Sequence, residues 1–238
     1  MAAAAKASRA QIKKTASGAK ASKTVSLKTA DKTNAPGELS AKPKSKREQI
    51  VRAAVRVFLE NGYAGTSMNR VAEEAGVIKA TIYSHFADKE ALFTGIVEEM
   101  VLKKTNMNFQ VTDELLALAP EDFLDMMFAK FAILFEDKQY PAFFRVLVGE
   151  SERFPELADI YVKTVILRGM EMATRYFDNH PELGLSDSAA TAHIVAGSCI
   201  SLLVWQRVLG GEHLRKLEFA RVAGALKLLI IPRASKPL

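Results

Sequence analysis

The residues of this 238-residue chain that could contact a charged ligand cluster in one short segment. Residues 79–89 include two lysines, a threonine, a tyrosine and a histidine, namely Lys79, Thr81, Tyr83, His85 and Lys89. Cations and hydroxyl donors of this kind suit phosphate oxygens and the edges of nucleic-acid bases. The segment is therefore a candidate nucleic-acid contact, provided that a helix presents these side chains on an exposed face.

The rest of the sequence lacks the common signatures of catalysis. It contains no His-Glu-x-x-His zinc motif, no glycine-rich phosphate loop, no nucleophile elbow and no Glu-x-x-His motif of a bundle metal site. Cys199 is the single cysteine, and its small apolar neighbours predict an inert buried thiol, because a reactive thiolate needs cationic neighbours. We expect a protein that is not an enzyme and has no catalytic residue, metal site or cofactor.

Three predicted helices would position the polar segment. Apolar residues recur at helical spacing over residues 46–61, and Asn61-Gly62 is a typical helix end. Short helices over 67–74 and 78–85 follow, with Gly76 in the turn between them. Two short helices joined by such a turn form a helix-turn-helix, whose second helix can enter the major groove of DNA. A plain three-helix bundle with a solvated polar face would show the same spacing.

The chain after Lys46 predicts an all-α fold. Its apolar residues recur at helical spacing, and no Asn-Gly or Asp-Gly hairpin turn joins two β-branched runs. Glycine and proline residues divide it into about nine helical pieces. Beyond the three helices above, the expected pieces are 89–105, 121–136, 141–152, 155–177, 187–209 and 212–230.

Residues 47–99 resemble the DNA-binding domain of the TetR family of regulators. The matching segments are Ile50-Val51-Arg52-Ala53-Ala54, Phe58, Gly62-Tyr63, Thr66-Ser67, Val71-Ala72, Ala75-Gly76-Val77, Thr81-Ile82-Tyr83, His85-Phe86, Lys89-Glu90 and Leu92-Phe93. The resemblance implies an all-helical homodimer that binds a palindromic operator, usually as a repressor that a small ligand releases. It also implies a helix-turn-helix domain over 46–104 and a ligand-binding and dimerisation domain over 105–238.

The resemblance carries over roles for individual residues. Lys79, Ala80 and Thr81 would read or line base edges. Thr66, Tyr83, His85 and Lys89 would mainly bind phosphates. The chain departs from the family at Ile78, where a serine usually caps the recognition helix, and losing such a cap costs about 1 kcal/mol.

The second half of the chain is expected to form the dimer. The segment 148–157, with the sequence Val-Gly-Glu-Ser-Glu-Arg-Phe-Pro-Glu-Leu, is similar to the AefR-like subgroup of TetR C-terminal domains. The expected helix over 187–209 is rich in small residues, and the one over 212–230 is apolar around much of its girth. The resemblance implies that both helices join a four-helix interface with a second chain. Ordinary core within one chain is the alternative.

An unidentified apolar effector is expected to bind in the same half. Aromatic and thioether side chains concentrate there, and Met127, Phe131, Phe144 and Trp205 are the candidate contacts, with Tyr161 and Arg168 as candidate polar anchors. Ligand sites are mostly apolar, and methionine adapts to irregular ligands. A stripe of methionine and phenylalanine is nevertheless more often plain hydrophobic core.

Residues 1–45 form a basic tail. They hold ten of the 33 lysines and arginines, only two of the 27 acidic residues and no aromatic residue. This composition predicts disorder, because little apolar surface is available to offset the ordering entropy. The tail could be a non-specific arm for DNA phosphates, an inert extension or a transit peptide. An architectural, largely sequence-independent DNA-binding protein is accordingly the alternative to an operator-specific regulator.

The sequence predicts a cytoplasmic protein with no membrane partner. No uninterrupted apolar run reaches the length of a membrane span, and the N-terminal segment lacks the apolar stretch of a signal peptide. The expected partners are double-stranded DNA with a palindromic operator, a second copy of the chain and a small-molecule effector.

Overall fold

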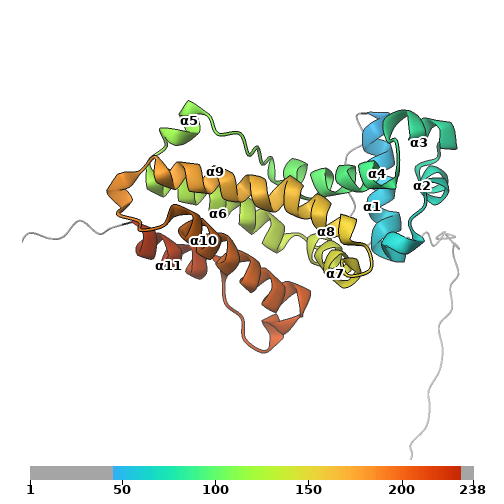
Figure 1. Ribbon diagram of the computed structural model, residues 1–238. Coiled ribbons are helices and arrows are strands. Elements are labelled where there is room, and N and C mark those ends of the chain that lie inside the picture. The colour runs from blue at the N-terminus through green and yellow to red at the C-terminus, as the bar shows by residue number, and fades with distance from the viewer. Residues whose placement is uncertain (1–44, 232–238) are drawn as a thin grey trace, which may run out of the picture. The chain divides into compact units, whose positions relative to one another are not determined.

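A computed structural model describes residues 45–231 of the chain (Figure 1). This range contains helices and no strand, which confirms the predicted all-α fold. Its first helices are α1 (Lys46–Gly65), α2 (Met68–Ala75), α3 (Lys79–His85) and α4 (Lys89–Val97). Its later α-helices are α5 (Asp113–Leu116), α6 (Pro120–Glu136), α7 (Tyr140–Glu150), α8 (Pro155–Tyr161), α9 (Leu167–Asp178), α10 (Ser188–Leu203) and α11 (Phe219–Ile230). The predicted tail, apart from Ser45, lies outside the described residues.

Local capping fixes the ends of the helix-turn-helix segment. The Ser67 hydroxyl accepts the Arg70 N–H at 3.2 Å and starts α2, which ends at Gly76 with a φ of 63°. Such a left-handed end favours glycine because it has no Cβ. Asp88 starts α4 by accepting the Ala91 N–H at 2.7 Å. Ile78 starts α3 with no side-chain cap, as its residue type predicts.

Helix α1 is interrupted close to its predicted end. Gly62 has a φ of 67° and a ψ of −174°, which breaks the helix before one further turn to Gly65. This backbone conformation is almost restricted to glycine. The prediction that the helix stops at this glycine is therefore confirmed, although a short helical turn follows it.

Wide π-helical turns extend three of the helices. They are η1 (Glu98–Lys103) after α4, η2 (Val162–Ile166) between α8 and α9, and η4 (Val204–Val208) after α10. The pieces predicted over 89–105, 155–177 and 187–209 are each a helix that contains such a turn. Short 3-10 turns follow at η3 (Pro181–Leu183) and η5 (Gly211–His213). The single turn of α5 was not predicted.

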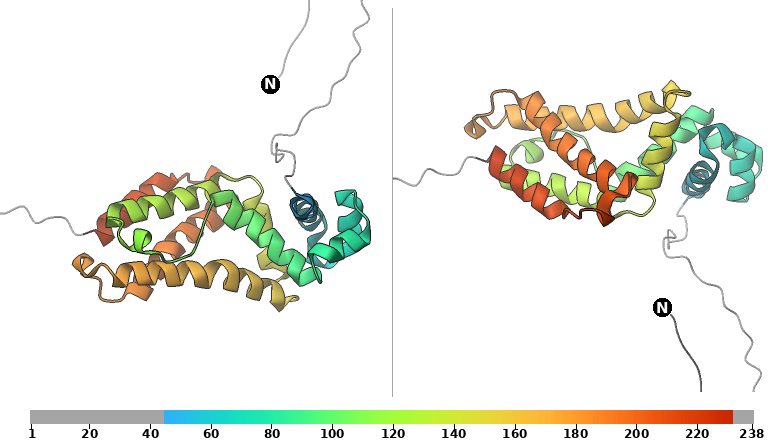
Figure 2. Two further views of the ribbon diagram at one scale, coloured as in Figure 1. Left: turned by 90° about the horizontal axis from the view of Figure 1, so that it is seen from above. Right: turned by 90° about the horizontal axis from the view of Figure 1, so that it is seen from below.

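Two hydrophobic clusters organise the described residues. The first joins α1–α4 to α7 and α8, and Phe58, Phe93 and Phe143 lie at its centre. The second joins α6, α9, α10 and α11 around Phe123 and Tyr176, whose rings stack at 3.6 Å between centroids. Figure 2 shows α1–α4 gathered at one end of these residues and α6, α9, α10 and α11 at the other. Residues 45–231 fall within one compact unit, so a domain boundary near residue 105 stays a prediction.

One helix is more apolar on average than the search for uninterrupted apolar runs suggested. Within residues 45–231, Ser188–Val208 is long and apolar enough to cross a membrane, with a mean hydropathy of 1.5, and only 28% of it is buried. The expectation overlooked it because small polar residues interrupt the run without lowering its mean hydropathy much. A single helix of this kind is weak support for a membrane span. It does show that an apolar face of α10 has no cover within the described residues.

Candidate DNA-binding surface and ligand cavity

The outer face of α3 presents most of the predicted base-contacting residues. Lys79, Ala80, Tyr83 and His85 are exposed, and Thr81 is half-buried. The opposite face of the helix is anchored by the buried Ile82. The structure thus brings these side chains together on one short helix with a fixed base, while their contacts with DNA stay a prediction.

The structure gives no support to the phosphate role predicted for Thr66. Its side chain is only 3% exposed, and its hydroxyl donates to the Gly62 carbonyl at 2.7 Å. This bond exists because the break at Gly62 frees a carbonyl that an unbroken helix would have used. Thr66 therefore stabilises the end of α1, and a phosphate could not reach it in this conformation.

Lys89 is half-buried beneath the helix-turn-helix segment. Its Nζ donates to the Tyr63 carbonyl and lies 3.8 Å from the centre of the Tyr63 ring. Burial lowers the pKa of Lys89, and the nearby carboxylates Glu150 and Glu156 oppose that shift. A phosphate contact by Lys89 stays a prediction. It would require the ammonium group to donate hydrogen bonds to the Tyr63 carbonyl and to a DNA phosphate at the same time.

Glu150 of α7 is a contact that sequence reasoning missed. Its Oε2 accepts the Tyr63 N–H at 2.6 Å, beside the break at Gly62 and the carbonyl that Lys89 binds. A Cβ at position 62 would overlap the Glu150 carboxylate, so the glycine is also required for this approach. The two residues are 87 positions apart, and an acidic residue in segment 148–157 was the only local signal.

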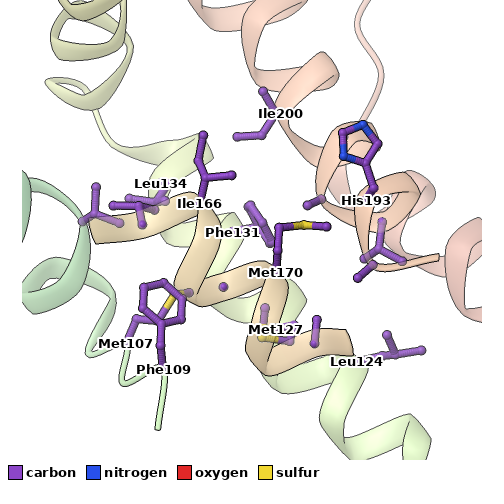
Figure 3. A pocket seen from close by; sticks show the side chains of 18 of the residues that line it. Met107, Phe109, Leu124, Met127, Phe131, Leu134, Ile166, Met170, His193 and Ile200 are labelled. Atoms are coloured by element: carbon purple, nitrogen blue, oxygen red, sulfur yellow. The ribbon is translucent and has the colours of Figure 1, made fainter. Parts of the chain in front are cut away.

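A cavity of about 280 Å³ lies between the two hydrophobic clusters. Its walls come from α6, α7, α8, η2, α9 and α10, with further residues before α5 (Figure 3). Met127, Phe131 and Phe144 line it, so the structure brings together three of the four predicted effector contacts. The other labelled wall residues are Met107, Phe109 and Met170, whose thioether and aromatic side chains also suit an apolar ligand, and Leu124, Leu134, Ile166, His193 and Ile200, which were not predicted as contacts.

Trp205, the fourth predicted contact, does not line this cavity. It lies in η4 and is 37% exposed, and its indole packs beside Gly211. Trp205 lies on an exposed stripe of α10 and η4 together with Ile194 and Ser201, neither of which lines the cavity. A ligand contact by Trp205 therefore has no support from this cavity and stays a prediction.

The cavity has few polar groups. Tyr140 and Tyr161 line it, and their buried hydroxyl oxygens lie 2.6 Å apart. Tyr161 was a candidate anchor, whereas Tyr140 was missed because α7 places it beside Tyr161 only in the folded chain. His193 is exposed in the lining, and Arg168 lies outside it, 5.8 Å from the Phe109 ring centre.

The remaining reactive side chains serve structural roles. Burial raises the pKa of the Cys199 thiol to about 12, which agrees with the inert thiol predicted. His180 stacks on Tyr176 and pairs with Glu182 at 2.6 Å. Residues 45–231 contain no group of three or more His, Cys, Asp or Glu side chains suited to a metal ion.

Comparison with known proteins identifies the family. The family described as "Bacterial regulatory proteins, tetR family" matches residues 50–96, and "AefR-like transcriptional repressor, C-terminal domain" matches residues 122–227. The chain is 31% identical over 142 residues to the HTH-type transcriptional repressor Rv1474c of Mycobacterium tuberculosis, covering 58% of this chain and 72% of that protein. The chain belongs to the TetR family. The members of this family are described as bacterial regulatory proteins.

Other TetR-family relatives match over shorter stretches or by fold. The HTH-type transcriptional regulator YerO of Bacillus subtilis is 29% identical over 115 residues, or 48% of this chain. The chain spans 39% of the length of YerO and 31% or less of the next curated relatives. The solved SmeT–triclosan complex has a TM-score of 0.61 at 19% identity and covers 81% of this chain and 98% of its own. At that identity the structural match shows a shared fold alone.

Proposed function

We propose that the protein is a homodimeric repressor that binds a palindromic operator and is released by a small apolar ligand. The observation that carries the proposal is the exposed face of α3, with Lys79, Ala80 and Tyr83 held above a closed core. A regulator that binds chromosomal DNA would be located in the cytoplasm. Two recognition helices related by a two-fold axis would read half-sites about 34–36 Å apart.

The open faces of α10 and α11 supply the proposed dimer interface. Ala190, Ile194, Gly197, Ser201 and Trp205 form an exposed stripe of mostly apolar or small side chains along α10 and η4. Leu228 and Leu229 are exposed on the neighbouring α11. Small residues on a helix face allow a second helix to approach closely. A dimer across these helices would cover the apolar face that the described residues leave open.

Helix α7 is the proposed route from ligand to DNA. Tyr140 and Phe144 line the cavity near its start, and Glu150 at its end binds the Tyr63 backbone in α1. A ligand that shifts α7 would thereby move the base of the helix-turn-helix. It releases DNA only if it binds the DNA-free state more tightly than the DNA-bound state.

Selection from a random duplex library tests the DNA-binding part of the proposal. The full chain and residues 46–238 are selected in parallel at physiological salt, and we expect both to enrich the same palindrome. In the same assay Lys79→Ala should lose operator affinity by roughly tenfold, since a base contact is worth about 1–3 kcal/mol. Lys163→Ala is the matched control, because Lys163 is an exposed lysine on η2.

Two results would contradict the proposal. Binding that enriches no sequence and vanishes without residues 1–45 would favour the architectural alternative, in which the tail supplies a salt-sensitive phosphate affinity. A monomer in light scattering at micromolar concentration would contradict the two-fold operator arrangement.

A further inference from the structure

Two residues of the cavity lining carry buried hydroxyl groups that satisfy each other only in part. Tyr140 and Tyr161 are both buried, both line the cavity and form one O–H···O hydrogen bond of 2.6 Å. In such a pair one hydroxyl donates and the other accepts, so the accepting hydroxyl keeps a proton of its own. Within residues 45–231 neither hydroxyl has a further hydrogen-bond partner. One O–H donor is therefore left without an acceptor, which is costly for a buried group.

The surroundings of this donor do not suit a charged ligand. Among the described residues that line the cavity there is no lysine, arginine, aspartate or glutamate. Burial raises the pKa of Tyr161 to about 12 and that of Tyr140 well above its usual range, so both hydroxyls keep their protons near neutral pH. A carboxylate buried here would lose its hydration without gaining a cation. His193 is the single side chain of the lining that could offset an anion, and it is exposed.

We propose that the cavity takes an uncharged, mainly apolar molecule with one hydrogen-bond acceptor, such as a carbonyl oxygen, to which the Tyr140–Tyr161 pair donates. The proposal rests on the ligand-responsive function above and adds the chemical class of the ligand. The volume of about 280 Å³ lies close to the lower end of the ~300–1,000 Å³ typical of ligand pockets, so the ligand is compact.

Three probes of similar size test this class by calorimetric titration of the full-length protein. Acetophenone carries a carbonyl acceptor, ethylbenzene is of similar size and lacks the oxygen, and benzoate carries a charge. An apolar cavity of about 150 Å³ can already hold benzene, so all three probes fit the available volume. The variant Tyr140→Phe/Tyr161→Phe removes both hydroxyls and leaves neither unpaired. Tyr176→Phe is the matched control, because its hydroxyl donates to the Leu118 carbonyl and the residue does not line the cavity.

The decisive quantity is the ratio of acetophenone affinity to ethylbenzene affinity. Any change of the cavity that affects both probes alike cancels in this ratio. We expect it to fall roughly fivefold in the double variant, the value of one net hydrogen bond, and to stay unchanged in Tyr176→Phe. Benzoate should bind more weakly than acetophenone. The carbonyl stretching frequency of bound acetophenone gives a second readout in the native protein, where a hydrogen bond should lower it relative to apolar solvent.

Several results would overturn the proposal. They are an unchanged ratio in a folded double variant, benzoate binding as tight as that of acetophenone, an unshifted carbonyl frequency, or no binding of any probe to the native protein. Tight benzoate binding that His193→Gln abolishes would instead assign an anion site to that histidine. Operator affinity is measured on the same preparations. Normal operator binding with failed probe binding counts against the ligand class alone, whereas normal probe binding without operator binding counts against the proposed function.

Discussion

The two hydrophobic clusters of the described residues differ in how completely side chains fill them. The part of the first cluster around Phe58 and Phe93 is closed, and these rings lie 5.2 Å apart with almost no exposed surface. The second cluster, around Tyr176, borders a cavity of about 280 Å³, which Tyr140 and Tyr161 at the edge of the first cluster also line. A surface that reads DNA needs side chains held in fixed positions, whereas a ligand site needs volume that the chain itself leaves unfilled. The same composition of phenylalanine, tyrosine and methionine serves both purposes, so packing and not residue type separates them.

Truncating one phenylalanine in each cluster gives the largest expected contrast. Phe58→Ala should lower the free energy of unfolding by about 3–5 kcal/mol, because it opens a void in a closed core. Phe131→Ala should cost only about 1–2 kcal/mol, because this half-buried ring already faces open volume. Equilibrium denaturation in urea measures both. Equal losses would mean that the cavity is filled or collapsed in solution.

The contact between α1 and α7 can be tested at Gly62. Gly62→Ala should lower the free energy of unfolding by about 1–3 kcal/mol, because alanine is strained at this φ and its Cβ overlaps Glu150. Gly149→Ala is the control, since Gly149 lies in α7 with open space around it. This substitution should raise the free energy of unfolding by about 0.5–1 kcal/mol.

A double variant separates strain from overlap. Part of the cost of Gly62→Ala should disappear in a Glu150→Ala background, because the overlap is removed while the backbone strain remains. Purely additive costs would show that Glu150 does not press on this turn.

The start of α3 offers the smallest effect. Ile78 is 73% exposed and provides no cap, so Ile78→Ser should raise the free energy of unfolding by about 1 kcal/mol or tighten operator binding. Ile78→Ala is the control, because alanine shortens the side chain without adding a cap. If the serine variant matches the alanine variant in thermal unfolding and in operator affinity, the missing cap has no consequence for this protein.

The features predicted well from sequence are those that local chemistry sets. Gly76 ends α2, Asp88 starts α4 and Ile78 leaves α3 uncapped, and each result depends on neighbours within a few residues. The helical spacing of apolar residues likewise predicted every long helix. Boundaries moved where a helix was broken and resumed, as at Gly62, and at the last helix, which was expected from residue 212 and begins at Phe219.

The features missed from sequence are those that distant segments create. Glu150 meets Tyr63, and Tyr140 meets Tyr161, only because α7 packs against α1 and α8. The positions of Thr66 and Trp205 were missed for a related reason. Their residue types fit the predicted roles. Packing, however, buries Thr66 within its own chain and leaves Trp205 exposed away from the cavity.

The π-helical turn η2 determines which residues share a face of the long helix that runs from α8 to α9. Tyr161 and Phe177 both line the cavity, although they are 16 residues apart. In an uninterrupted α-helix each residue turns by about 100°, so this separation would place them about 160° apart, on nearly opposite sides. The wider turn absorbs roughly one residue and brings them to about 60°. In terms of helical phase, η2 is equivalent to one additional residue accommodated within an α-helix. Deleting one residue from it would yield a regular helix in which the same two side chains, then 15 residues apart, still lie about 60° apart and face the same chamber.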